Sequence, residues 1–254
     1  MTFRKLPIAI AGVLASGLTL HHLSQPHVAS AQGITPKETV QAANGSRPEP
    51  PKTPPDNNTR PGGGLNPAAA TCNILNDGLR ALIPVENPVL TASAQPTFLF
   101  YIPFGAEEVQ FGEFSLLLWP GEEVRHYQTR FTLPDSPGIV SVTLPEAPAT
   151  ALVEGQIYRW YFQLYCKDGD GIQPDLTLNG AVQRVALTPE RTQQIQAATP
   201  EIWYDALAGV AYGLQHFPQD SQLQTQWREL LQLINAEDVT TTSFAGPILP
   251  LAEM

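Results

Sequence analysis

The stretch that decides the fold is Tyr158-Arg159-Trp160-Tyr161-Phe162-Gln163-Leu164-Tyr165-Cys166. Alternate residues are large and apolar, and the residues between them are mixed polar and aromatic, which is the pattern of a half-buried β-strand. Leu152 and Gly155 precede Tyr158 with the spacing of a tyrosine corner, in which the tyrosine hydroxyl bonds to upstream backbone. This combination is typical of immunoglobulin-like and fibronectin-like sandwiches.

Further strands of the same kind lie on both sides of this stretch. Period-two alternation between turn signals recurs in residues 79–83, 98–102, 114–118, 127–133, 140–144 and 179–187. No helical pattern separates these segments, which argues against a parallel α/β sheet. The sequence therefore predicts a mainly β fold over residues 71–187, an immunoglobulin- or fibronectin-like antiparallel β-sandwich.

A helical period follows over residues 188–236. Thr188-Pro189-Glu190 and Thr199-Pro200-Glu201 each offer a threonine N-cap, a proline at the first helical position and an acid in the first turn. Apolar side chains then recur every three or four residues from 203 to 217 and from 223 to 234, on either side of Pro218. We expect a C-terminal helical hairpin. Residues 237–254 show no clear pattern and are expected to form a tail.

The first 31 residues have the pattern of a signal peptide. Arg4 and Lys5 precede an apolar run over residues 6–20, and Ala29-Ser30-Ala31 fits a cleavage site. The run is shorter than the roughly 20 residues that a spanning helix needs, although a permanent membrane anchor is the alternative. Cleavage near Ala31 predicts a periplasmic or extracellular protein without a membrane span.

Residues 32–70 are rich in proline and glycine. They contain eight prolines, five glycines and no aromatic residue, so they cannot bury enough apolar surface to offset chain entropy. We expect a disordered linker with polyproline II stretches such as 47–52. A spacer is the favoured interpretation, and a proline-rich docking segment is the alternative.

Charge and motifs exclude several functions. The chain has 14 Lys and Arg against 24 Asp and Glu, a net charge of −10, so nucleic acid is not an expected partner. His126 and His216 have no metal-ligand spacing. Asp168 and Asp170 begin a loop that lacks the remaining ligands of a calcium loop, so a turn is expected there. The sequence predicts no catalytic residue, metal or cofactor.

Cys72 and Cys166 are the only cysteines. An exported chain meets an oxidising compartment, so the sequence predicts a disulfide between them. Two buried free thiols are the alternative.

Several motifs in order resemble a known family. They are Pro61-Gly62-Gly63-Gly64 ahead of Cys72, residues 96–103, the aromatic strand 158–166 and Trp203-Tyr204-Asp205-Ala206-Leu207. Over about residues 60–235 the chain is similar to the secreted cyanobacterial family called domain of unknown function 928. The resemblance implies an exported protein without an assigned activity, and it carries over no catalytic or binding residue.

Two functions of different class follow as hypotheses. The first is a noncatalytic cell-envelope module that binds a protein or glycan partner. The second is a hydrolase or transferase that acts on envelope polysaccharide through carboxylates. The possible binding surface is Arg159, Tyr161 and Tyr165, on the polar face of the aromatic strand. The competing expectation is that the hairpin with Trp203 and Trp227 lies across this face and buries at least Tyr161.

Overall fold

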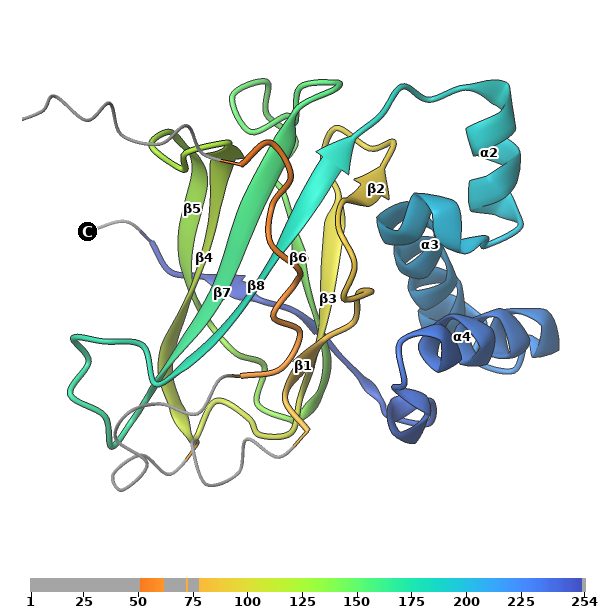
Figure 1. Ribbon diagram of the computed structural model, residues 1–254. Helices are drawn as coiled ribbons and strands as arrows, with labels where there is room; N and C mark the ends of the chain where they lie inside the picture. Colours follow the sequence, from red (N-terminus) through yellow and green to blue (C-terminus); the bar gives the residue numbers. More distant parts are fainter. Residues whose placement is uncertain (1–50, 62–71, 73–77, 253–254) are drawn as a thin grey trace, which may run out of the picture. The chain divides into compact units, whose positions relative to one another are not determined.

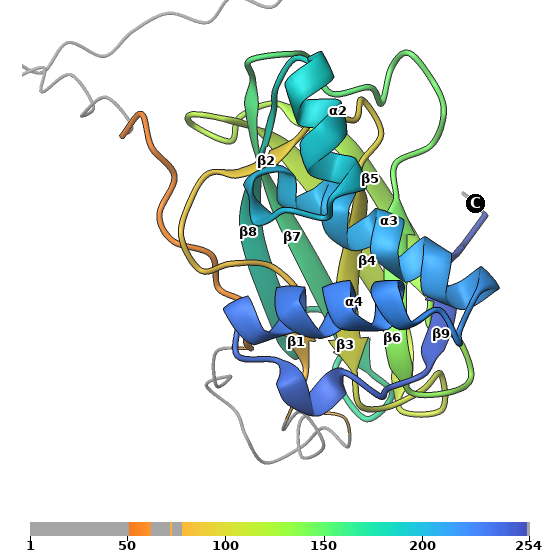
Figure 2. The same ribbon diagram turned by 90° about the vertical axis from the view of Figure 1, so that its right-hand side faces the viewer.

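The computed structural model describes residues 51–61, 72 and 78–252. Within them two β-sheets face each other, and helices lie beside the smaller sheet (Figures 1 and 2). The six-stranded sheet has the order β10 (Leu249–Pro250), β5 (Arg125–Thr132), β4 (Val109–Trp119), β7 (Ile157–Cys166), β8 (Leu176–Arg184) and β2 (Val89–Thr91). The four-stranded sheet has the order β1 (Arg80–Ala81), β3 (Thr97–Ile102), β6 (Gly138–Thr143) and β9 (Phe244–Pro247). The expected signal peptide and most of the expected linker lie outside the described residues.

The aromatic stretch forms β7, near the middle of the six-stranded sheet. Its apolar residues point into the space between the sheets, where Phe162 stacks on Phe100 of β3 with ring centroids 4.1 Å apart. Trp160 meets the ring of Phe100 edge to face. The predicted alternation of this strand is therefore confirmed, and its apolar face builds the core.

Tyr158 makes the hydrogen bond of the predicted corner. Its side chain is buried, and its hydroxyl accepts a hydrogen bond from the backbone N–H of Val153 at 2.9 Å. Gly155 lies in the intervening turn with φ +81°, a conformation that glycine adopts at little cost. This bond closes the connection that leads into β7.

Replacing Tyr158 with phenylalanine should lower the free energy of unfolding by about 1 kcal/mol, because the Val153 N–H loses its partner. Urea unfolding monitored by circular dichroism measures the change. Tyr212→Phe, at a side chain that is 66% exposed, is the matched control and should leave stability unaltered. Equal stability of Tyr158→Phe and the parent protein would contradict the role given to this hydroxyl.

The expectation of a purely antiparallel sandwich is wrong. β2 pairs in parallel with β8, and β6 pairs in parallel with β9, so both sheets are mixed. β9 and β10 come from residues 237–254, where the sequence shows no clear pattern and a C-terminal tail was expected. These strands are four and two residues long, too short for an alternation signal, and pairing with β6 and β5 defines them.

The helical region contains α2 (Pro189–Gln196), the 3₁₀ turn η1 (Pro200–Ile202), α3 (Trp203–His216) and α4 (Ser221–Leu233). Thr188 caps α2 by accepting the N–H of Arg191, as the sequence predicts, and Asp220 caps α4 by accepting the N–H of Gln222. The second predicted helix start, Thr199-Pro200-Glu201, does not begin an α-helix. Thr199 makes no side-chain capping bond, and a 3₁₀ turn precedes α3. The α-helix begins only where Trp203 and the next residue enter the core.

α3 and α4 pack beside the four-stranded sheet, and Figure 2 shows them crossing in front of β1, β3 and β6. α3 contacts β3, and it also contacts β2 of the other sheet. The indole N–H of Trp203 donates to the carbonyl of Leu82 at 2.9 Å. The hydroxyl of Tyr204 accepts the indole N–H of Trp160, also at 2.9 Å, so α3 is bonded to both layers.

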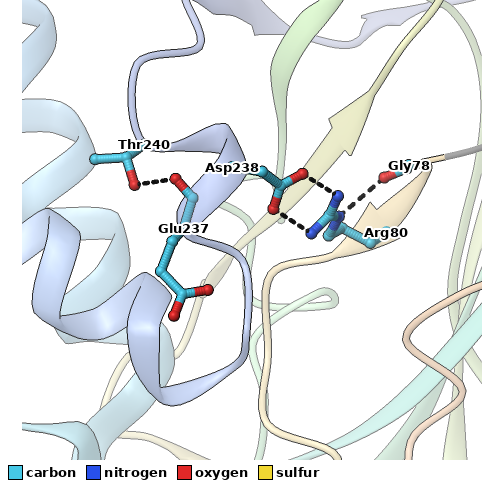
Figure 3. A network of polar contacts seen from close by, with 5 residues as sticks. All are labelled: Gly78, Arg80, Glu237, Asp238 and Thr240. Carbon is cyan, nitrogen blue, oxygen red and sulfur yellow. Dashed lines mark hydrogen bonds and ion pairs between the residues drawn. The ribbon is translucent and has the colours of Figure 1, made fainter.

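An ion pair attaches the segment after the hairpin to β1 (Figure 3). The guanidinium of Arg80 donates to both carboxylate oxygens of Asp238, at 2.6 and 2.9 Å, and its Nε donates to the carbonyl of Gly78. Asp238 belongs to the 3₁₀ turn η2 (Glu237–Val239). The Arg80 side chain is only 7% exposed, whereas that of Asp238 is 60% exposed. The hydrogen bonds from Arg80 hold the pKa of Asp238 below its ordinary value.

Asp238→Asn should lower the free energy of unfolding near neutral pH by about 1 to 2 kcal/mol, because Arg80 loses its charged acceptor and solvent screens part of the pair. The folded-state pKa of Asp238 is depressed, so its stabilisation is present above the unfolded-state pKa and is lost as pH falls through the folded-state value. The difference between parent and variant should therefore be largest at pH 6 and should shrink below pH 4. Urea unfolding at several pH values measures it, with the exposed Glu123→Gln as control. A difference that does not depend on pH would contradict the ion pair.

Residues 51–61, which we call the strap, belong to the segment predicted to be a disordered linker, but within the described part of that segment they are attached to the sheet. Asn58 forms a backbone bridge with Asn179 of β8, and the buried side chain of Asn57 joins the carbonyl of Pro84 to the N–H of Ala181. The strap runs across β7 and β8, drawn in orange in Figure 1. Composition does not reveal this, because two asparagine residues anchor the strap through polar groups rather than through apolar burial.

Candidate functional site

The outer face of the six-stranded sheet carries the residues that the sequence singled out. Arg159, Tyr161, Gln163 and Tyr165 of β7 point away from the core. In Figure 1 the helices lie on the far side of β3 from this face. The strand register gives Tyr161 and Gln163 polar neighbours on both sides: Glu113 and Ser115 on β4, and Thr177 and Asn179 on β8.

We call five at least partly exposed side chains of this face the open patch: Phe111, Glu113, Arg130, Tyr161 and Gln163. Glu113 of β4 lies opposite Gln163 on one side and opposite Arg130 of β5 on the other. A row of acidic, amide and basic groups therefore crosses three adjacent strands.

Aromatic stacking fixes one end of the open patch. The ring of Phe111 stacks on that of Tyr165, with centroids 4.2 Å apart and planes 18° from parallel. The guanidinium of Arg130 lies 5.1 Å from the centre of the Phe111 ring, and its Nε is 3.4 Å from Glu113. Tyr165 is only 9% exposed and supports Phe111 from below, and burial raises the pKa of its hydroxyl. Phe111 and Arg130 thus present a preorganised aromatic and cationic pair.

Tyr161 lies at the other end of the open patch. Its hydroxyl donates to Oε2 of Glu122 at 2.7 Å, and Glu122 reaches it from the turn between β4 and β5 with φ +56°. Burial and this carboxylate raise the pKa of Tyr161, so the hydroxyl stays protonated at neutral pH and remains a donor.

Arg159, the third predicted surface residue, is covered by the strap. It is 5% exposed, and its Nη1 donates to the carbonyl of Pro55 at 2.8 Å. Its Nη2 donates to Oδ1 of Asn179. Of the three predicted residues, Tyr161 is therefore partly exposed, while Arg159 and Tyr165 are buried.

The expectation that the hairpin covers Tyr161 is wrong. α3 packs on β3, whose outward residue Leu99 is apolar and only 4% exposed. The outer face of β7 offers Arg159 and Gln163 at the equivalent places. An apolar helix stripe gains more from covering Leu99 than from desolvating such polar groups, and this decides where the hairpin lies.

Cys72 and Cys166 form the predicted disulfide. Their Cα atoms are 5.6 Å apart, and both side chains are fully buried. The bond connects the C-terminal end of β7 to the segment that precedes β1. A disulfide is consistent with a protein of an oxidising compartment.

Two hollows lie away from the open patch. One, of about 380 Å³, is lined by the α3–α4 hairpin and residues 240–244, including Trp227 and Arg228. The other, of about 240 Å³, contains Asp205, whose Oδ2 accepts the Thr91 hydroxyl at 2.7 Å and the Ala92 N–H at 3.0 Å. Burial raises the pKa of Asp205. These hydrogen bonds make Asp205 a structural link between α3 and the end of β2.

The candidate metal and acid residues are dispersed. Within the part of the chain that the structure describes, no group of three or more His, Cys, Asp or Glu side chains is placed to hold a metal ion. Nε2 of His126 pairs with the carbonyl of Thr150, and Nδ1 of His216 pairs with that of Tyr212. Asp170 accepts the N–H groups of the residues that follow it, which lowers its pKa and makes the predicted turn.

The sequence matches a known protein family. Residues 57–244 match the family described as Domain of Unknown Function (DUF928), and the chain belongs to that family. No curated protein matches the chain. Among the described residues, no helix is both long enough and apolar enough to cross a membrane.

Sequence reasoning missed Phe111, Glu113, Arg130 and the strap. The first two lie on the outward positions of β4, which the inward series at 114, 116 and 118 already implied. Their placement beside Arg130 depends on strand register, for which the sequence has no local signal.

Proposed function

We propose that this chain is an exported, noncatalytic cell-envelope module that binds a protein or glycan partner through the open patch. The observation that carries the proposal is the Phe111–Arg130 pair, held by Tyr165 and Glu113 on a rigid sheet. Aromatic and arginine side chains that are fixed before binding lose little conformational entropy when a partner binds. The buried disulfide supports export, and the Tyr158 bond supports an immunoglobulin-like relationship of the sandwich.

The carboxylate enzyme is less well supported by the same face. A glycoside hydrolase needs two carboxyl groups facing a bond between them. Glu113 is paired with Arg130, and Glu122 accepts the hydroxyl of Tyr161, so each has a structural partner. Binding is the function that these contacts favour.

Site-specific photocrosslinking in the native envelope tests the proposal. A photoreactive amino acid at position 163, in the middle of the open patch, should give a discrete adduct. Protease or glycosidase digestion of the adduct then distinguishes a protein from a glycan. The matched control places the same group at Arg228, which is exposed on α4.

Arg130→Ala should remove most of the position-163 adduct, because it eliminates the cation above Phe111 and the partner of Glu113. Circular dichroism should show an unchanged fold, since Arg130 is exposed. Equal crosslinking from positions 163 and 228, or an adduct that does not depend on Arg130, would contradict binding at the open patch.

A further inference from the structure

The first half of the strap contacts the sheet as a bound peptide contacts its receptor. The carbonyl of Lys52 accepts the indole N–H of Trp119 at 2.9 Å, and the carbonyl of Pro55 accepts Nη1 of Arg159 at 2.8 Å. Between these two carbonyls the side chain of Pro54 is buried, while the side chains on either side of it are exposed. One buried proline and two anchored carbonyls therefore hold residues 51–55.

The chemistry of the receptor residues matches that of the segment. Proline has no backbone N–H, so a proline-containing segment offers mainly carbonyl acceptors. Indole and guanidinium groups are donors only, and Trp119 and Arg159 supply these at the two carbonyls. Recognition of proline-rich peptides by aromatic surfaces follows the same chemistry.

The two halves of the strap are held with different strength. The second half has the buried Asn57 side chain, with its two bonds to backbone, and the bridge of Asn58 to Asn179. The first half has only the contacts to Trp119, Arg159 and the amide of Asn87, together with the burial of Pro54. We therefore expect residues 51–55 to detach from the sheet more readily than Asn57.

Arg159 indicates what a better occupant would carry. Its guanidinium is almost completely buried, yet its Nε has no hydrogen-bond partner. Its hydrogen bonds go to a carbonyl and an amide oxygen, the Tyr161 side chain lies beside it, and within the described residues it forms no ion pair. A buried cation without an anion is incompletely satisfied, and a carboxylate would complete it.

We propose that the surface of Trp119, Arg159 and Asn87 is a docking site for an extended, proline-containing peptide of a partner protein, which carries an acidic side chain directly before the proline that replaces Pro54, where the strap has Thr53. Residues 51–55 occupy this site in cis and are displaced by the partner. The docking site is distinct from the open patch, because the two share no residue, so this inference goes beyond the function proposed above.

Two labelled peptides test the docking site. Both follow residues 51–56, Pro-Lys-Thr-Pro-Pro-Asp, with the threonine replaced by glutamate in one and by glutamine in the other. The receptor is the full chain with Pro54→Ser, which weakens the strap, and fluorescence anisotropy measures binding. Both peptides keep the aspartate that corresponds to Asp56, which forms no ion pair with Arg159 in the strap. We expect the glutamate peptide to bind at least about tenfold more tightly than the glutamine peptide, because the two differ only in the anion at the position of Thr53.

Three variants assign the effect. Without Pro54→Ser, the strap competes at a high effective concentration, and binding of the glutamate peptide should be about tenfold weaker. Adding Arg159→Gln to Pro54→Ser should abolish the preference for glutamate. Adding Arg130→Gln, which changes the open patch, should leave both affinities unaltered and so separates this site from the proposed function.

Several results would overturn the proposal. They are the absence of binding to folded Pro54→Ser at millimolar peptide, equal affinity for the two peptides, or a preference for glutamate that survives Arg159→Gln. If Pro54→Ser does not fold, the parent chain is titrated to millimolar glutamate peptide and the indole N–H resonance of Trp119 is followed by NMR, with Trp119→Phe to assign it. A resonance that shifts on titration supports displacement of the strap, and one that does not shift overturns it.

Discussion

Trp160→Ala is expected to lower the free energy of unfolding by about 3 to 5 kcal/mol. The Trp160 side chain is fully buried where the two sheets and α3 meet, with its ring centroid 5.6 Å from that of Phe100. Its indole N–H donates to the hydroxyl of Tyr204, which in turn donates to the carbonyl of Ala181 at 3.3 Å. The alanine variant therefore loses packing and leaves a buried hydroxyl with one partner fewer.

Trp160→Phe and Tyr204→Phe separate packing from hydrogen bonding. Each is made alone and both together, and urea unfolding gives the coupling free energy. We expect a coupling of about 1 kcal/mol for the indole–hydroxyl bond. If the changes in unfolding free energy of the two phenylalanine variants are fully additive, the indole–hydroxyl bond contributes nothing. If Trp160→Ala lowers the free energy of unfolding by less than about 1 kcal/mol, the central place of Trp160 in the core is contradicted.

Loss of the Cys72–Cys166 bond is expected to lower the free energy of unfolding by about 4 kcal/mol. The bond joins residues 94 apart in sequence, and a cross-link over such a loop strongly restricts the unfolded chain. Cys72→Ala with Cys166→Ala measures the loss in urea unfolding.

Reductant provides the control for the disulfide. Dithiothreitol should destabilise the parent protein by a similar amount and should leave the double alanine variant unaltered. If dithiothreitol leaves the free energy of unfolding of the parent protein unchanged, or if the double variant is as stable as the parent, the stabilising role of the bond is contradicted.

The candidate site was only partly predictable from the sequence. The alternation of β7 placed Arg159, Tyr161 and Tyr165 on one face correctly. It could not show that the strap covers Arg159 or that Tyr165 lies beneath Phe111, because both contacts join residues far apart in the chain. The exposure of a side chain depends on the residues that the fold places around it, so a local sequence pattern does not predict it.

The sequence by itself determined the elements whose signals are local. Alternation in β3, β4 and β7 and the threonine cap of α2 depend on neighbours within a few residues. The sequence also left a single possible disulfide pairing, because the chain has only two cysteines, and the structure shows that this bond forms. Only the tertiary structure decided the parallel pairing of β2 with β8 and of β9 with β6, the side on which the hairpin packs, and the attachment of the strap. Each of these joins segments distant in sequence, and the free energy of burying apolar surface and satisfying backbone groups selects among pairings that the local patterns permit equally.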